Sequence, residues 1–460
     1  MKCVLLQIIP TLFTFAIMNA CHTKTHYQET QITDDLSYHH DLDNNDNFSP
    51  DNQWLVYDTR TDEGGIAASS KIERVNIHTK EKQILYQIPN NGDWGPGAGA
   101  VSYNTQSNEV IFINGLAHST PENPYQQWRR TGVMIDDSRP NQPIFMDARD
   151  VTPPFTAGAL RGGTHRHEWS GDGQWIGYTY NDALLQKLEA ETGEKHNLRT
   201  IGVSKKGIPV SVDNNEENVS GNWFSALVVR VVPNPIPGSD EISHAASDSW
   251  IGLHGYQNSA GQKQMARAFL GTVTSKEGEK VTEVFVVDIP DDITQVGEFG
   301  PLEGTETTFP MPPKGATQRR LTHTTDTKYP GCTGIVRTSP DGLYLSYIAK
   351  DPNGIQQIFL LSPNGGAPTQ LTEHDSDVSG NVRWHPDGKR LSYIYDGSIT
   401  LCEIGNRPFS ERLAILTKPS NPAPSNMVWS GNGKTLAYNR LIKDENKGVA
   451  TQQIFTLSID

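Results

Sequence analysis

Five short segments of the chain share one pattern of apolar and polar residues. Each begins with an aromatic or other strand-forming residue, passes through a turn of the Ser-Pro-Asp-Gly kind, and ends in an alternating run that closes on tyrosine. The segments are Phe48–Tyr57, Trp169–Tyr178, Thr338–Tyr347, Trp384–Tyr393 and Trp429–Tyr438. Because Pro, Asp and Gly favour a tight turn and alternation puts every second side chain on one face, each segment predicts a β-hairpin with one buried face.

Further strand-like runs follow most of these hairpins. Third strands are expected over 72–77, 357–361, 399–403 and 453–457, and fourth strands often end in Leu-Thr, as in Thr369–Thr372. Four antiparallel strands in a repeating unit predict a β-propeller blade. A degenerate copy at 103–112 and a blade without a clear turn motif between 250 and 322 bring the expected total to seven. Six blades remain the alternative, if the region from Trp250 is an embellishment.

The last blade lacks a fourth strand, because the sequence reaches Asp460 directly after the third. Residues 26–33 have the fourth-strand pattern, including a final Ile-Thr, and we expect them to pair with the strand near 453–457 and hide its edge. The sequence therefore predicts an all-β fold with a single propeller domain over 21–460. Loop insertions are expected at 189–221, 232–238 and 297–315.

The N-terminal segment predicts export. Lys2 precedes an apolar run that is short for a membrane span, so residues 1–20 are interpreted as a signal peptide. The run ends in Met18-Asn-Ala-Cys21, which resembles a bacterial lipobox and makes Cys21 the expected lipidation site. We therefore expect a cell-envelope protein that faces the periplasm or the exterior and contacts a membrane only through this anchor. Cys332 and Cys402 are expected to be free thiols.

Composition and missing motifs argue against several classes of function. Lys and Arg number 39 against 53 Asp and Glu, and the formal net charge of −14 argues against nucleic-acid binding. The sequence contains no Gly-rich phosphate loop, nucleophile elbow or HExxH motif, so nucleotide hydrolysis and serine esterase chemistry lack support. The expected partner is a small molecule, an acidic oligosaccharide or an envelope protein.

The candidate site is the central channel, because the innermost strands of a propeller converge there. The residues just before the turns include Asp46, Glu168, Arg337 and Arg383, which are candidate ligand-binding residues. With Arg337 and Arg383, Arg161 is a candidate carboxylate clamp. The alternative interpretation is a polar, water-filled channel with ordinary salt bridges.

A possible divalent metal site, for Mn, Ca or Zn, is the second candidate. His165 and His167 are two residues apart, so a regular strand would place both imidazoles on the same side, within reach of one metal ion. His254 or Asp46 is the expected third ligand. The alternative is that two channel histidines simply bind water.

The turn and Leu-Thr signatures resemble the TolB-like propeller repeat of bacterial periplasmic proteins over nearly all of the mature chain. More narrowly, segments 48–60, 72–79, 160–167 and 304–308 resemble the YidR-type family, a domain of unknown function. His165-Arg-His167 is also similar to the His-x-His pair of oligogalacturonate lyases, which are seven-bladed propellers that bind a divalent metal. Here the position three residues before His165 is Gly162, where the lyases have Gln.

Two functions follow from these observations, and no catalytic residue is assigned. The first is a binding scaffold, with its ligand in the channel or on one face. The second is a metal-dependent lyase or hydrolase that acts on acidic oligosaccharides, with His165 and His167 as metal ligands. Metal binding by the purified protein distinguishes the two.

Overall fold

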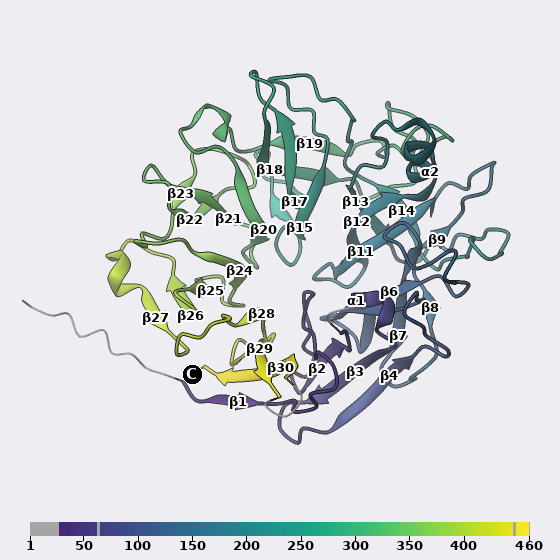
Figure 1. The fold of residues 1–460 in the computed structure, drawn as a ribbon. Helices are drawn as coiled ribbons and strands as arrows, with labels where there is room; N and C mark the ends of the chain where they lie inside the picture. Colours follow the sequence, from purple (N-terminus) through teal and green to yellow (C-terminus); the bar gives the residue numbers. More distant parts are fainter. Residues whose placement is uncertain (1–26, 62–64, 445–447, 460) are drawn as a thin grey trace, which may run out of the picture.

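Seven antiparallel sheets surround a central channel in the computed structural model, which describes residues 27–61, 65–444 and 448–459 (Figure 1). The prediction of seven blades is confirmed, and the region from Trp250 is a full blade rather than an embellishment. The predicted signal peptide and Cys21 lie outside the described residues. In the part of the chain that the structure describes, no helix is long and apolar enough to cross a membrane.

In blades 1 to 6 the strands follow one another along the chain from the channel outwards. Blade 1 contains β2 (Trp54–Asp58), β3 (Lys71–Asn76) and β4 (Lys82–Gln87). Blade 2 contains β5 (Ala98–Tyr103), β6 (Glu109–Gly115), β7 (Arg130–Asp136) and β8 (Ile144–Phe145). Blade 3 contains β11 (Gly162–Trp169), β12 (Trp175–Asp182), β13 (Thr200–Lys205) and β14 (Phe224–Leu227). Blade 4 contains β15 (Ala245–Trp250), β17 (Lys263–Thr274), β18 (Lys280–Ile289) and β19 (Thr317–Arg320), with β16 (Tyr256–Gln257) paired to β17.

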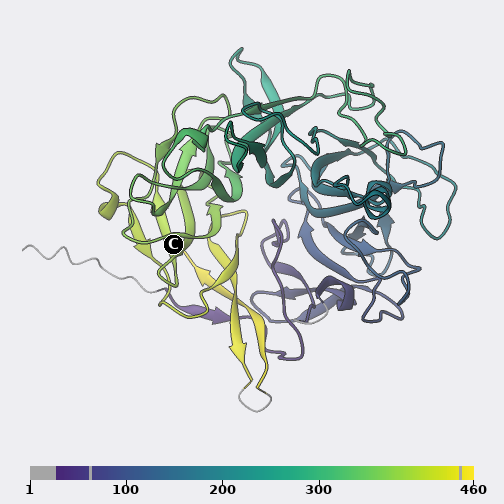
Figure 2. The same cartoon turned by 45° about the horizontal axis from the view of Figure 1, so that its top comes forward.

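The remaining blades are more regular. Blade 5 contains β20 (Cys332–Thr338), β21 (Leu345–Lys350), β22 (Gln356–Leu361) and β23 (Thr369–Gln370). Blade 6 contains β24 (Ser379–Trp384), β25 (Arg390–Tyr395), β26 (Ser398–Glu403) and β27 (Leu413–Ile415). Blade 7 contains β28 (Ser425–Trp429), β29 (Thr435–Lys443), β30 (Ala450–Ser458) and β1 (Glu29–Gln31). The β29–β30 hairpin, in yellow, extends beyond the neighbouring blades (Figure 2).

Short elements decorate this ring. They are α1 (Gly65–Ala68), α2 (Ala183–Thr192), the 3-10 helices η1 (Thr324–Asp326) and η2 (Phe409–Glu411), and the parallel pair β9 (Ala148–Arg149) and β10 (Ala159–Leu160). The expectation that 189–221 forms one loop is wrong, because β13 lies inside this range as the third strand of blade 3. Ile201 and Val203 alternate at the period of a strand and are both fully buried, which explains why this stretch pairs with β12.

The repeated turn is held by its own side chains. In the first copy Ser49 Oγ donates to Asp51 Oδ1 at 2.5 Å, and Trp54 N donates to Ser49 Oγ at 3.0 Å. The copies that begin at Ser170, Ser339 and Ser430 repeat this pattern of hydrogen bonds. Glycine follows in most copies because the position requires a positive φ, which is +73° at Gly342. These contacts explain why the motif fixes the end of every innermost strand that carries it.

Closure by the N-terminal segment is confirmed. In β1, Glu29 pairs with Leu457 and Gln31 with Phe455, so β1 supplies the fourth strand of blade 7. Figure 1 shows this purple strand beside the yellow C-terminal strands. Ile32 N then donates to Ile454 O at 2.8 Å, and the Ile32 side chain is buried. The chain ends therefore lock the ring and cover an edge that would otherwise be open.

Tryptophans connect neighbouring blades in the regular part of the ring. Trp384 Nε1 of blade 6 donates to Ser346 Oγ of blade 5 at 3.0 Å, and Trp429 of blade 7 makes the same bond to Ser392 of blade 6. Cys332 and Cys402 are free and buried, as expected. No disulfide joins these two cysteines, and the ring is held by hydrophobic clusters within and between blades.

Candidate functional site

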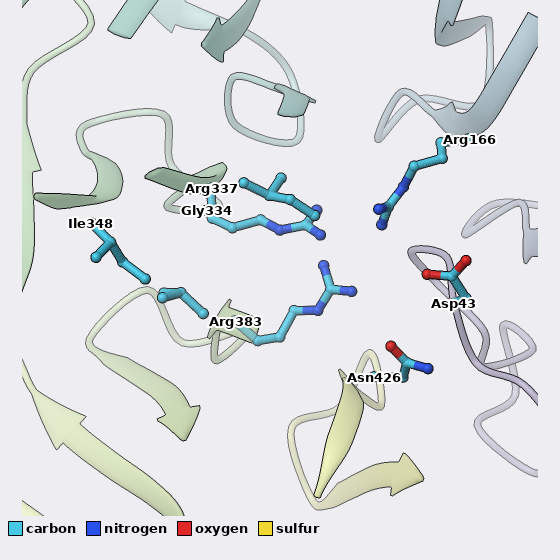
Figure 3. Close-up of a pocket in the computed structure, with 9 residues that line it drawn as sticks. Asp43, Arg166, Gly334, Arg337, Ile348, Arg383 and Asn426 are labelled. Atoms are coloured by element: carbon cyan, nitrogen blue, oxygen red, sulfur yellow. The ribbon is translucent and has the colours of Figure 1, made fainter. Parts of the chain in front are cut away.

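Two cavities occupy the channel. The smaller, about 60 Å³, is named here the cationic chamber and includes Asp43, Arg166, Arg337, Arg383 and Asn426 in its wall (Figure 3). The larger, about 610 Å³, is named the aromatic mouth, because it opens among the Ser-Pro-Asp-Gly turns and four tryptophans line it. Arg337 and Arg383 belong to the walls of both cavities. A single ligand in the channel can therefore touch both spaces.

Three guanidinium groups converge on the cationic chamber from three blades, as Figure 3 shows. Arg337 comes from β20 and Arg383 from β24, each just before the end of its innermost strand. Arg166 comes from β11, where a bulge interrupts the pairing between His165 and Glu168 and gives Arg166 a φ of +52°. A bulge re-aims a side chain out of the regular alternation, and here the redirected residue is Arg166.

The positive charge in the chamber has little compensation. Arg383 donates only to neutral oxygens, those of Met427, Asn45 and Asn44 at 2.6, 2.7 and 3.3 Å. Among the described residues, none forms a hydrogen bond or an ion pair with the side chains of Arg166 or Arg337. Arg337 is only 7% exposed, and its nitrogen atoms, which are not fully buried, reach solvent through the cavities that they line. The chamber is thus a concentration of unpaired cations within a protein of net negative charge.

The carboxylates near the chamber are committed elsewhere or partly protonated. Asp43 pairs with Arg60 at 2.9 Å. Glu168 accepts from Asn45 at 3.0 Å and pairs with Arg267 at 2.9 Å. Burial, with the negative charge of Glu168 nearby, raises the pKa of Asp46 to about 6 against the opposing effect of the arginines. The arginines therefore face a weak internal counter-charge.

The same geometry disturbs the arginines themselves. Burial, together with the positive charge of Arg383, lowers the pKa of Arg337 well below its ordinary value. Burial and the charge of Arg166 lower the pKa of Arg383 to about 10. Both lowered pKa values mean that the chamber disfavours the charged form of these arginines. A bound anion would stabilise that charged form.

The predicted ligand-binding residues meet only in part. Asp46, Glu168, Arg337 and Arg383 do lie together in the wall of the aromatic mouth. Arg161 does not join them: its side chain is fully buried, pairs with Asp182 at 2.7 Å and donates to Thr308 O at 2.8 Å. The expectation of a carboxylate clamp at Arg161 is therefore wrong, because an acidic partner within blade 3 already occupies it.

The structure also separates the three histidines proposed as metal ligands. His165 Nε2 lies 3.1 Å from Asn181 Oδ1, whereas His167 Nε2 lies 2.9 Å from Thr164 Oγ1. The two side chains occupy opposite faces of β11, since the bulge at Arg166 shifts the alternation, and both are buried. His254 lines a different cavity with Trp175 and Lys263. In the described ranges no three His, Cys, Asp or Glu residues are placed to hold a metal ion.

Two parts of the site escaped sequence reasoning. Arg166 stands between the two histidines, but regular alternation would have turned it away from the channel, and only the bulge reverses this. The tryptophans of the mouth had a visible signal. Trp169, Trp384 and Trp429 each precede a turn motif, and this position ends the innermost strand.

Fold and channel together define a seven-bladed β-propeller with an arginine cluster on its axis. Residues 97–218 match a family described as "Protein of unknown function (DUF3748)". The chain is 36% identical over 413 residues to "Uncharacterized protein YidR" of Escherichia coli (strain K12), an alignment that covers 87% of this chain and 92% of that protein. The chain therefore belongs to the YidR family.

One solved structure supports the propeller fold at a TM-score above 0.5. An oligogalacturonate lyase from Vibrio parahaemolyticus superposes with a TM-score of 0.51 at 10% identity, and 95% of each chain is covered. A putative TolB from Agrobacterium tumefaciens gives a TM-score of 0.37 at 13% identity, with 85% of this chain and 98% of that chain covered. At such identities the likeness to the lyase concerns the fold alone. The ligand has to be inferred from the residues that line the channel.

Proposed function

We propose that this protein is a binding protein that holds an anionic ligand, one that bears a carboxylate or phosphate group, in the cationic chamber. One observation carries the proposal: Arg337 is 7% exposed, points into the chamber and has no partner among the described residues. A largely buried charge without a partner is destabilising, by up to about 3 to 5 kcal/mol where it is fully desolvated. A bound anion between Arg166, Arg337 and Arg383 offsets that cost by forming charge-assisted hydrogen bonds.

The decisive experiment replaces Arg337 with methionine and measures thermal unfolding with and without trigalacturonate or inorganic phosphate. Because the substitution removes an unpaired charge, Arg337→Met should raise the unfolding temperature of the ligand-free protein. The same variant should weaken anion binding at least about tenfold, which corresponds to one lost charge-assisted hydrogen bond. Stabilisation together with lost binding separates a binding arginine from a structural one.

The matched control is Arg139→Met, which removes an exposed arginine outside both cavities. It should change neither the unfolding temperature nor the binding. Binding to the unaltered protein should also weaken as pH rises through about 6, because Asp46 then gains a negative charge beside the arginines. Anion binding that Arg337→Met leaves intact would contradict the proposal.

The competing function, a metal-dependent lyase or hydrolase for acidic oligosaccharides, requires the same class of anionic ligand. It stays a prediction from resemblance, because the separation of His165 from His167 removes the metal site on which it was based. Trigalacturonate as a probe tests binding for both functions, and product formation from it would support the enzyme.

We further propose that the binding protein is exported and anchored in the cell envelope through Cys21. The support is the apolar N-terminal run and the lipobox-like sequence that ends it. Cys21→Ser should move the protein from the membrane fraction to the soluble fraction of fractionated cells. An unaltered protein that is already soluble would contradict the anchor and leave the channel proposal unaffected.

A further inference from the structure

The aromatic mouth differs chemically from the chamber that it adjoins. Four tryptophans from blades 3, 4, 6 and 7 reach its wall, and the prolines of three turn motifs surround the opening. The tryptophans are Trp169, Trp250, Trp384 and Trp429, and the prolines are Pro50, Pro340 and Pro386. At about 610 Å³ the cavity has the size of a small-molecule site, and it is far larger than the space needed for one or two ordered waters.

Several polar side chains of this wall, apart from the charged Asp46 and Arg337, are already hydrogen-bonded within the protein. Ser249 Oγ donates to Val336 O at 2.7 Å, and Thr338 Oγ1 donates to Trp250 O at 2.8 Å. Gln106 Nε2 donates to Gly171 O at 2.9 Å. These side chains therefore have few hydrogen bonds left for the hydroxyl groups of a sugar.

Three of the four indole N–H groups are used in the same way, whereas Trp169 Nε1 is buried without a hydrogen-bond partner. Trp250 Nε1 donates to Glu168 O, Trp384 Nε1 to Ser346 Oγ and Trp429 Nε1 to Ser392 Oγ, each at 3.0 Å. Because these three nitrogens are already hydrogen-bonded, the rings that carry them can contact a ligand only through their carbon atoms. The mouth is thus prepared for apolar contact.

Leu253 adds an apolar residue at the entrance. It lies in the connection between β15 and β16, where its N–H donates to Pro340 O at 2.9 Å, and its side chain remains 50% exposed beside the cavity. An apolar group bound in the mouth would cover this leucine and gain its contact.

We propose that the ligand of this channel is an amphiphilic acid, whose anionic group lies between the chamber arginines and whose acyl or aromatic body fills the aromatic mouth. This inference rests on the proposed function, since it places the anion at the same arginines. Arg337 and Arg383 line both cavities, so an anion held by these two arginines lies at the boundary between the chamber and the mouth. An acidic oligosaccharide is the alternative occupant that the test has to exclude.

The test is isothermal titration calorimetry of the full chain with four probes: octanoate, acetate, 1-octanol and trigalacturonate. Octanoate should bind at least about tenfold more tightly than acetate, which lacks the apolar body, and than octanol, which lacks the charge. It should also bind more tightly than trigalacturonate. Tryptophan fluorescence should change with octanoate, because four tryptophans line the mouth.

Two matched leucine variants locate the apolar body. Leu253→Asp puts a charge at the entrance and should weaken octanoate binding about tenfold with acetate binding unchanged. Leu343→Asp is the control, because Leu343 is 59% exposed on the neighbouring turn but does not line the mouth. This control should bind both probes as the unaltered protein does.

The outcomes separate the two proposals. If octanoate binds no more tightly than acetate while acetate binding depends on Arg337, the inference is overturned and the proposed function stands. Tighter binding of trigalacturonate than of octanoate would also overturn the inference and leave the proposed function standing, with a sugar as the occupant. If no anion binds, both proposals fail.

Discussion

The contacts between blades 5, 6 and 7 and those between blades 3 and 4 differ in whether they include buried charges. In the first region a tryptophan donates one neutral hydrogen bond to a serine of the preceding blade, as Trp384 does to Ser346. In the second region Trp250 of blade 4 likewise donates from Nε1 to Glu168 O of blade 3 at 3.0 Å, and a cation is buried beside its ring. Arg267 of blade 4 pairs with Glu168 of blade 3 at 2.9 Å and donates from Nε to Asp248 at 2.7 Å.

The consequences for the sequence differ as much as the contacts. At the blade 3–4 junction Gly177 replaces the residue that is Ser346 in blade 5, because a Cβ there would lie 2.0 Å from Arg267 Nη1. Burial alone would lower the pKa of Arg267, but the carboxylates of Asp248 and Glu168 raise it, so the cation is retained. We expect the loss of one partner to cost less free energy at the regular junction, where the groups are neutral, than at the ionic one, where a buried charge loses its partner.

The largest effect is therefore expected from Arg267→Met. The substitution leaves Glu168 and Asp248 as buried acids without their cation, and it should lower the free energy of unfolding by about 3 to 5 kcal/mol. Urea denaturation at neutral pH measures this. The control is again the exposed Arg139→Met, for which we expect a change within about 0.5 kcal/mol.

A second substitution sharpens the same result. Asp248→Asn in the Arg267→Met background removes one of the stranded charges and should recover part of the lost stability. An Arg267→Met protein that loses less than about 1 kcal/mol would mean that the acids protonate or reach water, and the two kinds of junction would then be energetically alike.

The repeated elements of the fold could be predicted because their causes are local. The Ser-Pro-Asp-Gly turn depends on hydrogen bonds between residues two to five positions apart, such as those of Ser49 with Asp51 and Trp54. Alternation after the turn then sets the buried face. Closure by residues 26–33 was predictable for a similar reason, since an incomplete last blade needs a strand with the fourth-strand pattern.

The site was predictable from the position of a residue along its innermost strand and not from alternation, because β20 and β24, like β11, carry a register shift. Arg337 and Arg383 were placed in the channel correctly as positions near the ends of innermost strands. At His165 and His167 the alternation fails because of a bulge, and the sequence carries no local signal for it. Arg161 was misassigned for another reason: its side chain pairs with Asp182 of the next strand and donates to Thr308, 147 positions away along the chain, and the sequence does not single out either partner.

The smallest expected effect tests the regular junction through a double-mutant cycle of Trp384→Phe and Ser346→Ala. Each single change leaves one buried polar group without its partner, whereas the double change removes both. We expect a coupling energy of about 0.5 to 1.5 kcal/mol from urea denaturation of the four proteins. A natural Phe–Ala pair already stands at an equivalent junction of this protein. Phe48 of blade 1 packs in one cluster with Ala437 of blade 7, and these positions are equivalent to Trp384 and Ser346.

That natural pair explains why the double variant should fold well, and a second pairing shows whether the coupling is specific. Trp429→Phe combined with Ser346→Ala changes two different junctions, since Ser346 accepts from Trp384 of blade 6 and not from Trp429 of blade 7. Its effects should add within about 0.5 kcal/mol. If this mismatched pair couples as strongly as the matched one, the tryptophans act through general packing and not through a specific hydrogen bond. The two kinds of junction would then differ only in the buried charges of blades 3 and 4.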